Sequence, residues 1–139
     1  MKIESAGFLR KANRSAMAAV VILVLIYTLG MYVNLFIEIP EDATAWQFAM
    51  KSIILLLHLS LGSLLIIHST SLVAMSVKDK NSKWMIFSGV GLAGVLLSVA
   101  TGSSFITHQT ELSSLLMALG FGVSIIAYTF GIYRSSSTK

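Results

Sequence analysis

The sequence contains no cysteine and one proline, and charged residues make up only 12% of its 139 residues. Without cysteine the chain can form no disulfide, no thiolate metal site and no covalently attached c-type haem, so histidine, methionine, tyrosine or carboxylate must hold any cofactor. The scarcity of charge accompanies 55% hydrophobic residues and a mean hydropathy of +0.83, which excludes an ordinary soluble domain. The composition therefore predicts an integral membrane protein.

Four apolar runs are separated by short polar connections. Each run is near or above the ~20 residues that a helix needs to span a bilayer. Because short connections make neighbouring helices antiparallel, we expect residues 1–139 to form one all-α domain, a four-helix antiparallel bundle in the lipid bilayer. The expected spans are Ala16–Ile39, Trp46–Val77, Trp84–Thr107 and Leu112–Tyr133.

Lysine and arginine are absent from two of the connections, "EIPEDATAW" and "THQTEL". Basic residues instead flank the opposite ends of the spans, and such residues stay on the cytoplasmic side. The pattern predicts a multi-pass protein of the plasma membrane with cytoplasmic N- and C-termini. This topology and the anionic inner leaflet account for the net charge of +4 without a nucleic-acid partner. The flanking residues are Lys2, Arg10, Lys11, Arg14, Lys78, Lys80, Lys83, Arg134 and Lys139.

No acidic or basic residue lies in the middle of any expected span. A proton or ion transporter would normally place such residues there, so transport is disfavoured. The spans also contain no HExxH motif and no serine at helical spacing from His58 that would pair a nucleophile with a base. Nothing in the sequence supports catalysis, and a redox role would be limited to electron transfer.

Small residues form stripes along the last two expected helices when each residue is rotated by 100°. In lipid such stripes mark the sides on which helices pack closely. They predict a tight bundle. The third span places Gly91, Gly94, Ser98, Thr101 and Gly102 on one stripe, and the fourth places Ser113, Gly120, Ser124, Ala127 and Gly131 on another.

Two histidines, His58 and His68, lie in the apolar run "HLSLGSLLIIH". The same projection puts His58 and Ser69 on the small-residue face of the second helix and His68 about 80° away from His58, with about 15 Å of rise between the two histidines. One metal ion cannot bind both. His58 and His108 lie at depths that differ by ~8 Å, so two neutral imidazoles on adjacent helices could ligate one haem b. Lys51 lies on the inward side of the same helix, nearer to the outer membrane surface than His58, and would neutralise a propionate of the haem.

Each histidine also has a simpler interpretation. His68, included among the cofactor-binding candidates, could instead be a buried neutral imidazole hydrogen-bonded to a carbonyl, serine or threonine of a neighbouring helix. His108 could be a solvated residue at the membrane interface. In the haem hypothesis His58 and His108 are the metal ligands, and small residues leave room for the macrocycle, namely Gly62, Gly94, Ser98 and Gly102.

This architecture, with both ends inside, a histidine in "HLSLGSLLIIH" and glycine-rich third and fourth helices, resembles the small membrane cytochromes b and one half of the haem A synthase fold. The resemblance implies haem b binding through His58 and His108 and electron transfer to a quinone or a larger membrane complex. Half-size haem A synthases carry a glutamate close before the histidine of the second span. This sequence departs from that pattern, since nothing acidic lies near His58.

The alternative is a non-catalytic accessory subunit of a larger membrane complex, without a cofactor of its own. The small size of the chain, its lack of a soluble domain and its few reactive groups agree with this interpretation. Both hypotheses permit a homo-oligomer, because the small-residue stripe of the fourth span could pack against a second copy.

Overall fold

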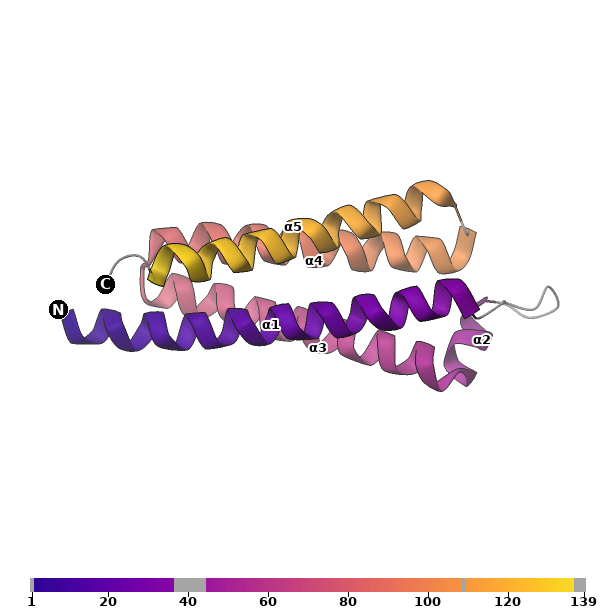
Figure 1. Ribbon diagram of the computed structural model, residues 1–139, viewed down its shortest axis with the longest axis horizontal. Coiled ribbons are helices and arrows are strands. Elements are labelled where there is room, and N and C mark those ends of the chain that lie inside the picture. The colour runs from indigo at the N-terminus through magenta and orange to yellow at the C-terminus, as the bar shows by residue number, and fades with distance from the viewer. Residues whose placement is uncertain (1, 37–44, 109, 137–139) are drawn as a thin grey trace.

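The computed structural model describes residues 2–36, 45–108 and 110–136, and the regular structure of these residues is helical. Four long helices lie side by side, and a short one precedes the second of them (Figure 1). Each long helix has at least 26 residues, or about 39 Å at 1.5 Å per residue, and is apolar enough to span a bilayer. The all-α prediction with four apolar membrane-length helices is confirmed. The helices are α1 (Lys2–Phe36), α2 (Ala45–Lys51), α3 (Ile53–Lys78), α4 (Ser82–His108) and α5 (Glu111–Ser136).

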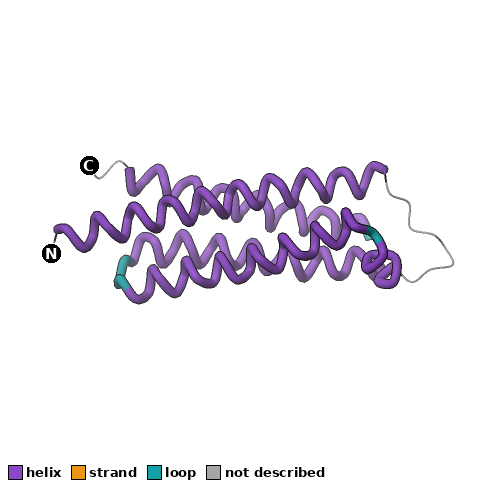
Figure 2. The backbone as a smooth tube through the Cα atoms, turned by 90° about the horizontal axis from the view of Figure 1, so that it is seen from below, coloured by secondary structure: helices purple, strands orange, loops and turns teal. Residues whose placement is uncertain are grey.

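The four long helices form a closed ring of contacts. α4 packs against both α3 and α5, and α1 packs against both α3 and α5. Figures 1 and 2 show that α3 and α4 join at the end of the bundle where α1 begins and α5 finishes. We call this end the basic end and the opposite one the far end.

Helix α1 begins well before the predicted start of the first span at Ala16. The amino-terminal segment continues without interruption into the membrane-length part, and the predicted end at Ile39 lies outside the described residues. Side chains three or four positions apart share a helix face, and five of them are buried here. Burial of Phe8 in particular makes this segment part of the bundle. The buried residues are Phe8, Ala12, Ala16, Ala19 and Leu23.

The predicted second span, Trp46–Val77, is divided at Ser52. Ser52 has an extended backbone with φ −86° and ψ 115°, and its hydroxyl accepts a hydrogen bond from the Leu55 N–H at 3.5 Å. Serine suits this position because its side chain can satisfy an N–H group that has no partner inside the helix. The short α2 therefore turns away from the axis of α3 at the far end (Figure 1).

The close contact of α4 with α5 follows the two predicted stripes. Gly91 and Gly94 are buried on α4, as are Gly120 and Ser124 on α5. The Ser124 hydroxyl lies 3.0 Å from the Gly91 carbonyl oxygen and 2.9 Å from that of Gly120, and so links the two helices. The prediction of tight small-residue packing is confirmed for this helix pair.

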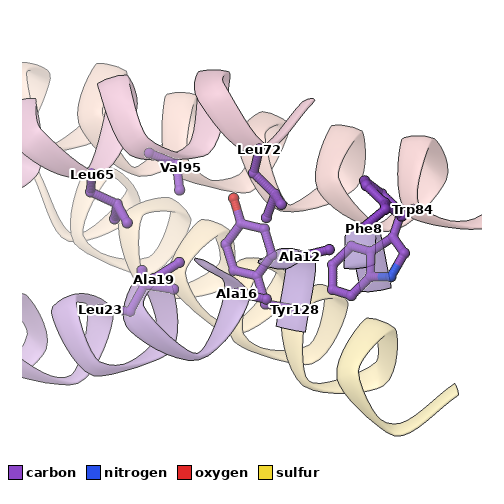
Figure 3. Close-up of a cluster of buried hydrophobic side chains, with 10 residues drawn as sticks. All are labelled: Phe8, Ala12, Ala16, Ala19, Leu23, Leu65, Leu72, Trp84, Val95 and Tyr128. Carbon is purple, nitrogen blue, oxygen red and sulfur yellow. The ribbon is translucent and has the colours of Figure 1, made fainter. Parts of the chain in front are cut away.

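The buried apolar core lies in the half of the bundle nearest the basic end. Figure 3 shows Trp84 beside Phe8, with Tyr128 between α1 and the helices carrying Leu72 and Val95. Beyond Leu23, none of the described residues of α1 is buried, and the same holds for α4 beyond Val95. The far half of these two helices therefore has no closed core.

Candidate functional site at the histidines

His58 lies on α3, half-buried against α1. A methyl group added to Gly30 would come within 3.1 Å of the imidazole Cε1, so the ring sits directly on the glycine. The ring also lies close to the Ile26 backbone of α1, but its buried Nδ1 atom forms no hydrogen bond of good geometry with the described residues. His58 is thus part of the contact between α1 and α3, and Gly30 provides the space for it.

His68 contacts the same helix, fifteen residues closer to its beginning than Gly30. Its Nε2 atom lies 2.9 Å from the Ser15 carbonyl oxygen and 3.0 Å from the Ser15 hydroxyl. A carbonyl oxygen can only accept, so Nε2 carries a hydrogen and has no lone pair for a metal. These are the partners expected if His68 serves helix packing, and both histidines contact α1.

The other two candidates are far more exposed. His108 is the last residue of α4, and Lys51 is the last residue of α2. Because the backbone bends at Ser52, Lys51 does not continue the helix of His58, and the projection that put it above His58 does not apply. Within the described ranges, no three histidine, aspartate or glutamate side chains come together as a metal site.

The space predicted for a macrocycle is mostly occupied. A methyl group on Gly94 would lie 2.6 Å from the Gly120 carbonyl oxygen, and one on Gly102 would lie 3.3 Å from the Met117 sulfur. Ser98 donates its hydroxyl to the Met117 carbonyl at 2.9 Å. Only Gly62 of the four predicted residues faces open space. The residues present therefore fit a haem between His58 and His108 poorly, because α5 already fills the groove of α4.

A second polar pair, Ser69 and Tyr128, lies in the centre of the core. Both residues are fully buried, and their hydroxyl groups are close but form no hydrogen bond of good geometry. The tyrosine ring lies over Gly91, where any added methyl group would overlap it. Figure 3 shows its hydroxyl pointing between Val95 and Leu72. The sequence places Ser69 on the packed face but gives no sign of Tyr128, because a tyrosine in an apolar run is equally compatible with the lipid surface.

The fold and these contacts define a class: a bundle of membrane-length helices whose deep polar groups lie mainly at helix interfaces. No protein-family model, curated protein or solved structure matches this chain. Its function therefore has to be inferred from its own residues.

Proposed function

We propose that this chain is a small multi-pass subunit of a plasma-membrane protein complex. In this proposal it is an antiparallel four-helix bundle with both termini in the cytoplasm, it holds no cofactor, and its far half binds a transmembrane helix of a partner protein. The observation that carries the proposal is the uneven burial of α1 and α4.

Helix ends are often less buried than helix centres, but the basic end and the far end of this bundle differ in how deeply their side chains are buried. At the basic end Phe8 and Trp84 retain only 6% and 1% of their exposed surface, although both lie within two turns of a helix start. At the far end Leu35 and Phe36 of α1 remain 63% and 70% exposed. Helices α1 and α4 thus have buried side chains near the basic end, and their far halves are left available to a partner helix.

A polar group in the far half supports an additional protein contact, because the Asn34 side chain is exposed on α1. Amide groups in a membrane usually bind across helix interfaces, since lipid chains offer no hydrogen bonds. A partner helix at the far half would provide such bonds.

Site-specific photocrosslinking in the native membrane tests this proposal. We expect a photoreactive residue at Tyr32 or Leu35, in the far half of α1, to form one discrete protein adduct. The same residue at Met17 or Val21, in the basic half of the same helix and also exposed, is the matched control and should give lipid adducts. Identical adduct patterns at all four positions would refute the proposal, and adducts with a second copy of this chain would replace the partner with a homo-oligomer.

Haem b binding is the second candidate, favoured by the buried Nδ1 atom of His58, which forms no hydrogen bond of good geometry with the described residues. It would make the chain an electron-transfer protein that serves a quinone or a redox complex, with His58 and His108 as ligands and Lys51 at a propionate. It requires α4 and α5 to separate near Gly94. Absorption spectra of the purified protein, oxidised and reduced, distinguish the two functions: a Soret band lost in both His58→Ala and His108→Ala would establish the cytochrome.

A further inference from the structure

A hollow of about 320 Å³ opens at the basic end where three elements meet. Its apolar wall includes Leu9 of α1 together with Trp84 and Phe87 of α4, and its polar wall includes Lys80, Lys83 and Arg134. None of the described residues that line it is acidic. The hollow therefore combines three cationic side chains with an apolar wall.

The turn between α3 and α4 fixes the position of the two lysines. Lys80 adopts a left-handed backbone conformation with φ 49°, and its N–H donates to the Val77 carbonyl at 3.0 Å. The Asn81 N–H donates to the Ser76 carbonyl at 3.1 Å, and the Asn81 side chain accepts from the Trp84 N–H at 3.1 Å. These bonds close α3 and start α4, so the cations stand on an ordered turn.

A second hollow, of about 290 Å³, runs along the outer surface of α4 and α5 and is almost entirely apolar. Ile86 and Val90 of α4 face Val123 and Ile126 of α5 across it. Its position between two membrane-length helices places it against the acyl region of a bilayer. We call it the apolar groove.

The two hollows adjoin each other. Phe87 lines both of them, and its ring meets that of Phe130, in the groove wall, edge-on at a centroid distance of 5.8 Å. The guanidinium carbon of Arg134 lies 5.7 Å from the centre of the Phe130 ring, which is a cation–π geometry. The hollow at the basic end thus meets the apolar groove at the rings of Phe87 and Phe130.

We propose that the two hollows form one binding site for an anionic phospholipid. The headgroup phosphate binds among Lys80, Lys83 and Arg134, and an acyl chain lies in the apolar groove. The order of the compartments matches that of a lipid, since the cations lie at a helix end and the groove lies deeper. Basic pockets between transmembrane helices at the membrane surface are known to bind acidic headgroups.

Charge and shape together select this ligand over simpler ones. Inorganic phosphate would satisfy the cations but leave the groove to bulk lipid, and a zwitterionic lipid would fill the groove without supplying net negative charge. The proposal requires both parts of the molecule to contribute. It does not depend on a partner protein or on haem.

Native mass spectrometry of the detergent-purified chain, titrated with phosphatidylglycerol or phosphatidylcholine, provides the first test. We expect the triple variant Lys80→Asn, Lys83→Gln, Arg134→Gln to bind phosphatidylglycerol more weakly by on the order of a hundredfold, since each basic residue contributes roughly fivefold near anionic lipid. Asparagine is chosen at position 80 because it tolerates the left-handed conformation. The matched control removes three exposed cations outside the hollow, Arg10→Gln, Lys11→Gln and Arg14→Gln, and should retain binding.

The second test concerns the groove. Val123→Trp should fill it and reduce phosphatidylglycerol binding about tenfold, the loss expected from excluding part of one acyl chain, whereas Val21→Trp on exposed α1 should have no effect. Equal losses in both basic triple variants would overturn the proposal in favour of diffuse charge attraction. Displacement of the lipid by millimolar inorganic phosphate, or equal binding of phosphatidylcholine, would also overturn it.

Discussion

Gly94 of α4 and Gly120 of α5 lie against each other's backbone. A methyl group added to either residue would lie 2.6 Å from the carbonyl oxygen of the other. Such contact is possible only because neither residue has a Cβ atom, and it allows Ser124 and Ser98 to hydrogen-bond across to the facing helix. The pair is a close backbone contact between α4 and α5.

Replacing Gly94 or Gly120 with alanine should therefore destabilise the protein. Helix backbones cannot move aside as a flexible side chain can, so we expect each change to lower the free energy of unfolding by about 2–3 kcal/mol. Reversible unfolding in mixed micelles by SDS titration measures this. Gly89→Ala on α4 and Gly122→Ala on α5 are the controls, because nothing lies within 4 Å of the added methyl group. Equal losses at all four glycines would mean that the helices do not meet at Gly94 and Gly120.

His68→Ala removes the hydrogen bonds from Nε2 to Ser15. Interhelical hydrogen bonds in membranes contribute roughly 0.6 kcal/mol on average and up to about 1.7, so we expect a loss near 1 kcal/mol. Ser15→Ala should cost less, because the stronger contact at 2.9 Å is to the backbone carbonyl, which remains. His108→Ala, at the exposed end of α4, is the matched control and should not change stability. A loss in the control as large as that in His68→Ala would contradict this assignment.

The packing of His58 on Gly30 is best tested by a double-mutant cycle. Gly30→Ala should cost about 1 kcal/mol, because the new methyl group would lie 3.1 Å from the imidazole Cε1 and the ring would have to shift by a few tenths of an ångström. The same change made in the His58→Ala background should cost nothing or stabilise the chain, because the ring is gone. The two effects are then non-additive by about 1 kcal/mol or more. Additive effects would show that the His58 ring does not pack on Gly30.

The all-α class and the four membrane-length helices could be predicted from the sequence because composition and span length constrain them strongly. The stripe on α5 also predicted which residues are buried there, such as Gly120 and Ser124, whereas only Gly91 and Gly94 of the α4 stripe are buried. In lipid, small residues mark the packed side of a helix whatever its neighbour, so this signal needs no knowledge of the partner.

The histidine site could not be predicted in the same way. Whether His58 faces α1 or α4 depends on the rotation of α3, and whether His68 meets Ser15 depends on the register of α3 against α1. Neither the rotation nor the register of α3 can be derived from the sequence of one helix alone. The break at Ser52 was missed because serine is compatible with both a helix interior and a helix start, and it moved Lys51 off the predicted face.

Tyr128 allows a sharper test of how the centre of the core is stabilised. Its ring is fully buried over Gly91, while its hydroxyl forms no well-oriented hydrogen bond with Ser69. Tyr128→Phe should therefore change the free energy of unfolding by less than about 0.5 kcal/mol, since no bond is lost. Tyr128→Ala should cost about 3–5 kcal/mol, the range for emptying a buried aromatic site.

Ser69→Ala is the companion variant for the hydroxyl pair, and we expect it to be as neutral as Tyr128→Phe. If either change costs more than about 1.5 kcal/mol and the double variant costs no more than the single ones, the two hydroxyl groups are hydrogen-bonded. The stability of the core would then depend on a polar bond between α3 and α5 as well as on the tyrosine ring. Near-neutral values for both variants would assign the contribution of Tyr128 to the apolar contacts of its ring with Gly91 and the surrounding core.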